Sequence, residues 1–348
     1  YAALGGAIDD GLIMALKDAG VDHRIEIIRE DTEVKPPIGL SRARKLILEN
    51  EVDVIVGLVS SGVLGAVRDF IHQSKTPLIV ANAGNVDATG KRCSQYIVRV
   101  SFSNAQITRP MGSWMVQNGI KTAYTLAPDY AAGHQMINAF AESFKASGGK
   151  IVGQDYTPFR KTKDFGPYLT KAQASNADAV FVFYSGSEAV AFVKQYGSLG
   201  LKDTLPLFGS GFLTSPLYVN AQGDGAIGST TSLHYVPTLE TPENKRFVAD
   251  FVENYNRLPS EFAIQGYDAG RVLAETIKSG AHDRQSITEA LSKVEYTGAR
   301  GPLKIDPATN NVIQNIYVYQ TIQGENGLTQ KIIDVVKNVQ DPPNGCVL

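Results

Sequence analysis

Residues 52–80 read VDVIVGLVSSGVLGAVRDFIHQSKTPLIV. The first eight, Val52–Val59, are an almost unbroken apolar run, which is typical of a strand buried on both faces of a parallel sheet. Residues 62–73 then carry apolar side chains at helical spacing, and Pro77–Val80 is the next apolar run. A strand, a helix and a second strand in this order predict one βαβ unit of a parallel sheet.

The same alternation of strands and helices continues along most of the chain. Long helices are expected at Pro242–Asn256 and Glu261–Ser279. Such alternation predicts an α/β fold in which helices cover both faces of parallel sheets. The expected strands are Arg24–Arg29, Val52–Val59, Pro77–Val80, Tyr96–Val100, Thr122–Leu126, Ile151–Tyr156, Ala179–Tyr184, Leu205–Phe208, Ile313–Thr321 and Lys331–Val336.

Length and composition exclude several classes of protein. At about 150 residues a domain, the 348 residues suggest two domains. A formal net charge of −2 argues against a nucleic-acid surface, which would need a basic stripe. No apolar run approaches the ~18 residues that a transmembrane helix needs. The five histidines are scattered without metal-ligand spacing, so no metal and no other cofactor is expected.

Two segments come close to nucleotide-binding motifs. Gly84–Lys91 has five residues between its glycines, where a P-loop has four, and Arg92 replaces the hydroxyl residue that binds Mg²⁺. Gly223–Gly228 matches G-x-G-x-x-G, but it follows a helix and precedes a strand, the reverse of a Rossmann turn. A nucleophile–base pattern is missing as well, so the sequence does not predict an enzyme.

Small and polar residues follow two of the expected strands. Ser60 and Ser61 open the helix after the first strand, and their hydroxyls either cap that helix or help its N-terminus to hold a carboxylate. The loop Asn82-Ala83-Gly84-Asn85 follows the next strand. Its small residues would let a ligand approach the backbone, although an ordinary turn would use the same residues.

Aromatic residues follow strands in the second half of the α/β pattern. Tyr130 lies in a loop after one strand, Tyr184 ends another, and Phe212 follows a third. Because ligands of open α/β sheets bind beyond the carboxyl ends of the strands, these rings could form an apolar slot. Each ring taken alone is explained as well by a place in the core.

In this order the segments resemble the type I periplasmic binding proteins of ABC importers, in the leucine/isoleucine/valine-binding branch. The stretches that carry the resemblance are Ser60–Ser61, Asn82–Asn85, DYAAG at 129–133, DFGPYLT at 164–170, NADAVFVF at 176–183, Gly223–Gly228 and QGYDA at 265–269. The resemblance implies two doubly wound parallel-sheet lobes, joined by three hinge crossings, that close on a ligand. Lobe one would be residues 1–102 and 234–316, lobe two residues 103–233 and 317–336, and the tail 337–348 would return to lobe one.

The resemblance also assigns ligand contacts. In lobe one, Ser61 and the loop Asn82–Asn85 match positions that hold a ligand carboxylate, and Phe262 matches an aromatic wall. In lobe two the matching positions are Tyr130 to Gly133, Ser187 and Gly211. Together with the strand-end residues, the expected ligand-binding set is Ser60, Ser61, Asn82, Ala83, Gly84, Asn85, Tyr130, Gly133, Tyr184, Ser187, Gly211, Phe212 and Phe262.

The residue at position 211 bears on the class of ligand. Amino-acid-binding members of this branch carry an acidic residue there, whereas this chain has Gly211. Because a buried ammonium without a partner is costly, we expect an aromatic or other apolar carboxylate. No Arg or Lys falls at a matched position, so neutral donors are expected to hold it. The alternatives are a branched-chain amino acid or amide, with Glu188 as the acid, or the ligand-binding domain of a sensor.

The two cysteines, Cys93 and Cys346, are compatible with incidental thiols or with one disulfide in an oxidising compartment. A tail that returns to lobe one, as the resemblance implies, would let Cys346 reach Cys93. The resemblance further implies a monomeric periplasmic protein that delivers a small carboxylate to the membrane permease of an ABC importer. Its signal peptide and the family's first strand would precede Tyr1.

Overall fold

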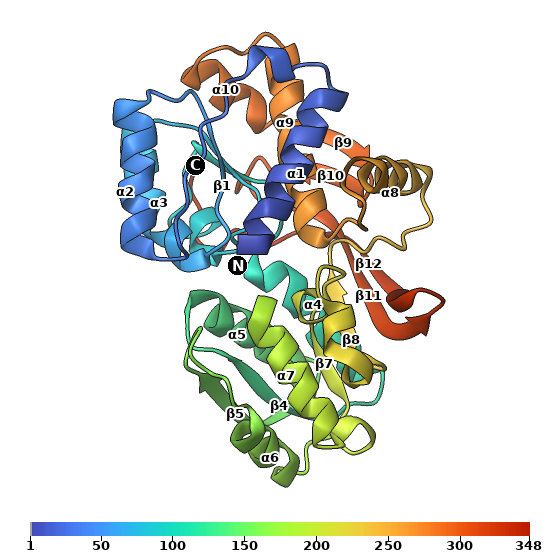
Figure 1. Cartoon of the computed structure of the whole chain (residues 1–348). Coiled ribbons are helices and arrows are strands. Elements are labelled where there is room, and N and C mark those ends of the chain that lie inside the picture. Colours follow the sequence, from blue (N-terminus) through green and yellow to red (C-terminus); the bar gives the residue numbers. More distant parts are fainter. Residues whose placement is uncertain (1) are drawn as a thin grey trace. The chain divides into compact units, whose positions relative to one another are not determined.

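The computed structural model describes residues 2–348, and the chain forms two compact units (Figure 1). Unit 1 comprises the residues up to Ser103, then Thr241–Gln314 and Asn338–Leu348. Unit 2 comprises Asn104–Glu240 and Asn315–Lys337. The α/β class with parallel sheets that the sequence predicts is confirmed in both units.

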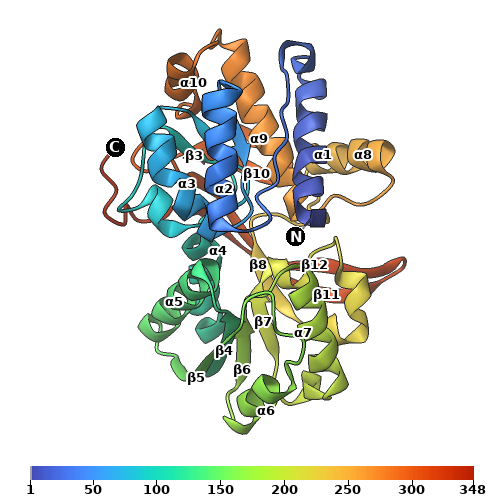
Figure 2. The ribbon, with the colours of Figure 1, turned by 60° about the vertical axis from the view of Figure 1, so that its left-hand side comes forward.

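Unit 1 is built on the parallel sheet β1-β2-β3, formed by Ile55–Gly57, Leu78–Val80 and Ile97–Arg99. In Figures 1 and 2, α2 and α3 run side by side on one face of this sheet, and α1 and α9 run side by side on the other. The helices of the unit are α1 (Ala2–Asp18), α2 (Pro36–Arg44, continued by the π-turn Lys45–Glu49), α3 (Ser61–Ser74), α8 (Pro242–Tyr255), α9 (Glu261–Lys278) and α10 (Arg284–Leu291).

Helices α1 and α9 approach each other very closely. A Cβ atom on Gly11 would lie 1.9 Å from the carbonyl oxygen of Ala263, and one on Gly266 would lie 1.9 Å from that of Ile8. Only glycine leaves room for backbones at this distance. The packing therefore fixes the position of α9, which carries Phe262.

The expected strand Arg24–Arg29 is not a strand in the structure. Arg24 ends a short 3₁₀ turn, Asp22–Arg24, and residues 25–30 pair with no strand. Of the expected strand Val52–Val59, β1 covers only Ile55–Gly57; among the described residues it pairs with β2 alone, and its three residues are half-buried. A strand exists only where a neighbour accepts its hydrogen bonds, and this pairing is not visible in a local pattern.

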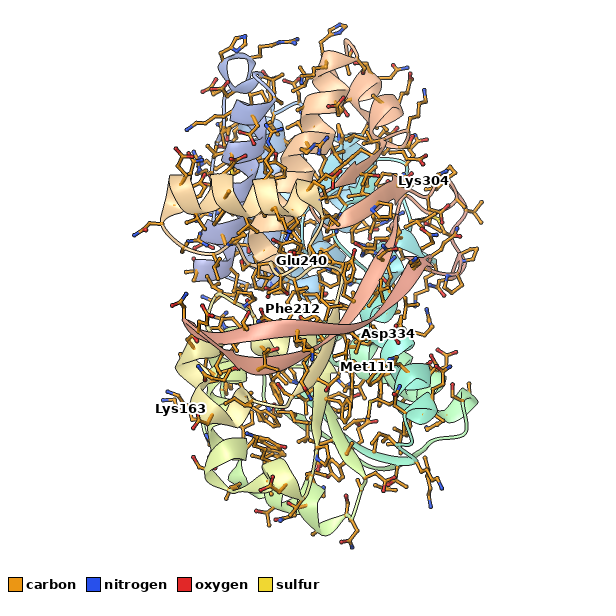
Figure 3. All side chains as sticks on the ribbon, turned by 90° about the vertical axis from the view of Figure 1, so that its right-hand side faces the viewer. Met111, Lys163, Phe212, Glu240, Lys304 and Asp334 are labelled. Atoms are coloured by element: carbon orange, nitrogen blue, oxygen red, sulfur yellow. A yellow bond between two sulfur atoms is a disulfide. The ribbon has the colours of Figure 1, made fainter. Side chains whose placement is uncertain are left out.

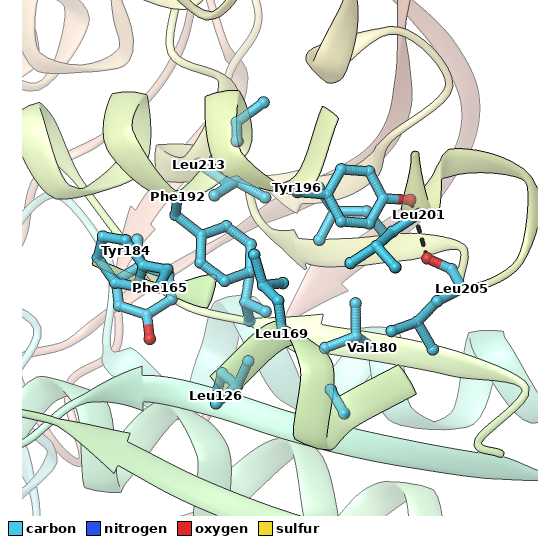
Figure 4. Close-up of a cluster of buried hydrophobic side chains, with 14 of the residues drawn as sticks. Leu126, Phe165, Leu169, Val180, Tyr184, Phe192, Tyr196, Leu201, Leu205 and Leu213 are labelled. Carbon is cyan, nitrogen blue, oxygen red and sulfur yellow. Dashed lines mark hydrogen bonds between the residues drawn. The ribbon is translucent and has the colours of Figure 1, made fainter. Parts of the chain in front are cut away.

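Unit 2 contains a larger parallel sheet in the order β5-β4-β6-β7-β8. Its strands are β4 (Thr122–Pro128), β5 (Lys150–Thr157), β6 (Ala179–Val182), β7 (Leu207–Ser210) and β8 (Thr230–Leu233). Its helices are α4 (Asn104–Gln117), α5 (Ala131–Ala146), α6 (Gly166–Ala174) and α7 (Gly186–Ser198), with 3₁₀ segments at Gly211–Thr214 and Val219–Ala226. Figure 4 shows the core under α6 and α7, in which Tyr184, Phe165 and Phe192 are fully buried.

A long hairpin follows, made of β11 (Val312–Gly324) and β12 (Gly327–Val339). Both strands are longer than the sequence pattern indicates, and β11 also pairs antiparallel with β8 and with β10 (Gly301–Ile305), which pairs with β9 (Glu295–Gly298). Trp114 of α4, the only tryptophan, donates its Nε1–H to Asp334 Oδ2 of β12 at 2.8 Å (Figure 3, with Asp334 labelled).

The tail after Lys337 belongs to unit 1 and is bonded to it. Cys346 forms a disulfide with Cys93. Of the two interpretations that the sequence left open, the disulfide agrees with the structure and a pair of incidental thiols does not. Earlier in the tail, buried Asp341 accepts hydrogen bonds from the hydroxyl of Ser103 and from Asn311 Nδ2.

Candidate ligand-binding site

The start of α3 lies at the carboxyl end of β1 in unit 1. Ser60 is the N-cap residue, and its Oγ accepts the N–H of Val63 at 3.4 Å, so the capping interpretation holds for Ser60. Ser61 follows as the first helical residue and is buried. Among the residues that the structure describes, the N–H of Gly62 has no acceptor. The positive end of the helix dipole makes this turn favourable for an anion.

The loop Asn82–Asn85 is tied to that helix. Asn85 Nδ2 donates to the carbonyl of Ser61 at 2.9 Å, and its Oδ1 accepts the N–H of Asp87 at 3.0 Å. Asn82 Nδ2 donates to Gln265 Oε1 of α9 at 2.6 Å. Both asparagine side chains therefore hold the loop in place. The N–H of Gly84 donates to none of the described residues.

Arg99, which the sequence pattern did not indicate as a site residue, holds the same loop. It is fully buried, and its guanidinium donates to the carbonyl oxygens of Asn85 at 2.7 Å and Ala83 at 3.4 Å and to Asn311 Oδ1 at 2.9 Å. Burial lowers the pKa of Arg99 to about 10, against the opposing attraction of Asp341, so it remains charged at neutral pH. Arg99 thus places a buried cation beside the loop, where it holds the loop's own carbonyl oxygens. In the sequence, the clue to this role was one charged residue inside an otherwise apolar strand.

Phe262 also lies in unit 1, in the first turn of α9. Ser260 caps this helix, and its Oγ accepts the N–H of Ala263 at 3.4 Å. Gln265, three residues after Phe262, is the partner of Asn82. The buried ring of Phe262 and the loop therefore share one rigid support.

Unit 2 carries four aromatic rings at the carboxyl ends of four neighbouring strands. Phe159 follows β5, Tyr130 follows β4, Phe183 follows β6 and Phe212 follows β7, which is their order in the sheet. The ring centroids of Phe159 and Tyr130 are 3.9 Å apart, those of Tyr130 and Phe183 6.2 Å, and those of Phe183 and Phe212 6.4 Å. We call these four residues the aromatic row. Tyr130 and Phe212 were predicted from the sequence as ligand contacts, whereas Phe159 and Phe183 were not.

Tyr184 is not part of the aromatic row. Its side chain is fully buried in the core of unit 2, against Phe165 and Phe192, and its hydroxyl lies 3.2 Å from Thr157 Oγ1 (Figure 4). Burial raises the pKa of Tyr184 above its usual value. At this strand end the preceding residue, Phe183, provides the ring.

Gly133 and Gly211 serve close packing inside unit 2. A Cβ on Gly133 would lie 1.9 Å from the carbonyl oxygen of Pro128, and one on Gly211 would lie 2.0 Å from the hydroxyl of Tyr319. A side chain at position 211 would therefore disturb the unit itself. Ser187 is exposed in the first turn of α7.

Residues 2–348 contain no helix that is long and apolar enough to cross a membrane. In the same part of the chain, no three His, Cys, Asp or Glu side chains gather as a metal would require. The positions that gather in unit 1 are the start of α3, the loop Asn82–Asn85 and its support Arg99. Those that gather in unit 2 are the aromatic row.

The family model described as "Periplasmic binding protein" matches residues 1–326. The chain belongs to the periplasmic binding protein family. A relative of this binding protein, "Leu/Ile/Val-binding protein homolog 6" of Brucella melitensis biotype 1, is 30% identical over 314 residues, which are 88% of this chain and 80% of the relative. The resemblance drawn from the sequence is thereby confirmed.

Two solved structures resemble this periplasmic binding protein over nearly its whole length. A solute-binding protein of an ABC transporter from R. palustris, in complex with benzoate, is 34% identical with a TM-score of 0.93, covering 100% of this chain and 96% of that one. A second, from Rhodopseudomonas palustris BisB5 in complex with 3,4-dihydroxybenzoic acid, is 33% identical with a TM-score of 0.92, covering 98% and 95%. Both of these similar proteins are solute-binding components of ABC transporters.

Proposed function

We propose that this chain is the extracytoplasmic solute-binding component of an ABC importer and that it captures a small aromatic carboxylate. The aromatic row of unit 2 carries the proposal. Stacked and edge-to-face rings contribute about 0.5–1.5 kcal/mol each beyond the area that they bury, which suits them to hold a planar ligand ring. The complexes of the two similar proteins with benzoate and 3,4-dihydroxybenzoic acid support the same class of ligand.

The carboxylate of the ligand would be held in unit 1, at the start of α3. Ser61, the N–H groups of Gly62 and Gly84, and the dipole of α3 would supply donors, and Arg99 would hold the loop that carries Gly84. Charge-assisted hydrogen bonds of this kind contribute roughly 1.5–3 kcal/mol each. Phe262, on the α9 support of that loop, would pack against the apolar part of the ligand.

Each unit would thus be one lobe that binds part of the ligand, and ligand binding would close the lobes about the segments in which the chain passes from one unit to the other. We propose that the protein is a monomer, that it leaves the ligand chemically unchanged, and that the permease of the importer is its partner. Small-angle scattering tests the closure, because saturating ligand should reduce the radius of gyration. An unchanged radius would argue for a rigid binding module.

Isothermal titration with benzoate, 3,4-dihydroxybenzoate, leucine and acetate tests the ligand class. We expect binding of the two aromatic acids and none of acetate, which has the carboxylate but no ring. If leucine bound and both aromatic acids failed, the ligand class would be wrong while the binding fold would stand.

A branched-chain amino acid is the second candidate, because the Brucella relative is named as a Leu/Ile/Val-binding homologue. Its ammonium would need an acid, and Glu188 is the candidate in unit 2. However, Glu188 Oε1 already accepts the N–H of Arg160 at 2.9 Å, and burial raises the pKa of Glu188, which disfavours the charged form that an ammonium needs. An aromatic acid therefore suits the site better.

A further inference from the structure

Two side chains of α7 hold the loop that joins β5 to α6, residues 158–165. Glu188 Oε1 accepts the N–H of Arg160 at 2.9 Å. Gln195 Oε1 accepts the N–H of Phe165 at 2.6 Å, and its Nε2 donates to the carbonyl of Lys163 at 2.8 Å. Residues seven apart lie on one face of a helix, about 10 Å apart along its axis. Helix α7 therefore anchors this loop at two separate points.

The anchored loop carries Phe159, the first ring of the aromatic row. The next residue, Arg160, has φ of 60°, a left-handed conformation that is unfavourable for any residue with a Cβ. The hydrogen bond from its N–H to Glu188 helps to keep the turn in this conformation. That turn sets the direction of Phe159, whose ring lies parallel to Tyr130 with an interplanar angle of 6°.

We propose that Glu188 and Gln195 are positioning residues for ligand specificity. By fixing the loop they keep Phe159 stacked on Tyr130, so that the flat outer face of the stack is already formed and a planar ring binds without first ordering the loop. This inference rests on the proposed binding of an aromatic acid. A saturated ring of the same size does not need a flat wall, so it gains less from the preformed surface.

Benzoate and cyclohexanecarboxylate are the probes, because they share the carboxylate and the ring size and differ in planarity. In Glu188→Ala and in Gln195→Ala we expect the dissociation constant of benzoate, divided by that of cyclohexanecarboxylate, to rise about tenfold. Glu188→Gln should keep the ratio within about twofold of the wild type, because the amide oxygen can still accept from Arg160. Lys194→Ala, at an exposed position of the same helix, is the matched control.

Amide hydrogen exchange without ligand tests the anchors directly. Arg160 should exchange faster in Glu188→Ala than in the wild type, and Phe165 faster in Gln195→Ala. Should one variant fail to fold, the other still tests the inference, since the two anchors are separate.

The outcomes separate the two proposals. A wild type that binds neither benzoate nor 3,4-dihydroxybenzoate overturns the proposed function, and this inference with it. A wild type that binds benzoate, with variants that weaken both probes equally or neither, overturns the positioning role alone. Unchanged exchange at Arg160 and Phe165 has the same consequence.

Discussion

The ring of Tyr130 lies parallel to the ring of Phe159, with 3.9 Å between their centroids and 6° between their planes. The two residues stand on loops that follow neighbouring strands, β4 and β5, and both are only half-buried. In such a stack each ring covers one face of the other, and the outer face of the stack remains as a flat apolar surface on which an aromatic ring could stack.

Removal of one ring from this pair should weaken the binding of aromatic acids. We expect Phe159→Ala to weaken benzoate about tenfold, because stacking and buried area are both lost. Tyr130→Phe keeps the ring and serves as the control. Isothermal titration measures both, and wild-type affinity in Phe159→Ala would remove the aromatic row from the site.

The two serines before α3 should separate stability from binding. Ser60→Ala removes the cap that Val63 uses and should lower the free energy of unfolding by about 1 kcal/mol, with little change in affinity. Ser61→Ala should weaken benzoate roughly ten- to a hundredfold, the loss of one charge-assisted hydrogen bond. Urea denaturation and titration of both variants give the comparison. If instead Ser60→Ala weakened binding and Ser61→Ala lowered only the stability, the ligand carboxylate would not bind at the start of α3.

Replacement of Arg99 by methionine should destabilise unit 1. The change removes the Arg99 donor from the carbonyls of Ala83 and Asn85, of which Asn85 keeps only the longer bond from the N–H of Ala88, and leaves buried Asp341 without its nearby cation, so we expect a loss of about 3–5 kcal/mol. Arg99→Lys should recover only part of it, because an ammonium cannot reach the same spread of acceptors. Denaturant unfolding measures the loss, and a wild-type midpoint in Arg99→Met would contradict the role given to Arg99.

Glu188 should make stability depend on pH. Burial raises its pKa above the usual value of 4.5, and Glu188 Oε2 has no hydrogen-bond partner among the described residues. The folded state therefore holds the proton more tightly than the unfolded state, so the contribution of Glu188 to stability is fully present below about pH 4.5 and is lost as pH rises through the folded-state pKa. Glu188→Gln should be as stable as the wild type at pH 4 and more stable at pH 7. If the wild type and Glu188→Gln had equal urea midpoints at pH 4 and also at pH 7, burial of the Glu188 carboxylate would not destabilise the protein.

Loss of the disulfide should free only the end of the tail. Asp341 is held independently by Ser103 and Asn311, so in Cys93→Ser/Cys346→Ser we expect loosening of residues 342–348 alone. Limited carboxypeptidase digestion should trim these residues in the variant but not in the oxidised wild type. A large drop in melting temperature would show that the bond stabilises more than the tail.

The sequence predicted the parts of the molecule that depend on local pattern. Apolar runs separated by amphipathic helices are enough to define an α/β chain, and strand ends rich in serine, glycine and asparagine pointed to the start of α3 and to the loop Asn82–Asn85. The lack of strand pairing at residues 25–30 was not predictable, because strand pairing joins segments that are distant in sequence.

The ring at the end of β6 could not be assigned from the sequence either. Phe183 and Tyr184 are both aromatic and both follow a strand buried on two faces, so no alternation of polar and apolar residues tells which one reaches the core. Phe159 lies in an irregular loop without periodicity. Arg99 acts through carbonyls that come together only in the folded unit, so its charge gave the single clue.

Trp114 gives the protein one natural fluorophore. Its indole N–H is bonded to Asp334 of the β11–β12 hairpin, and no other tryptophan contributes to emission. A red shift of that emission during denaturation would therefore report the opening of unit 2, while far-ultraviolet circular dichroism averages over both units. Coincident curves would mean that the two units unfold in one cooperative step, and separate curves would resolve the order in which they open.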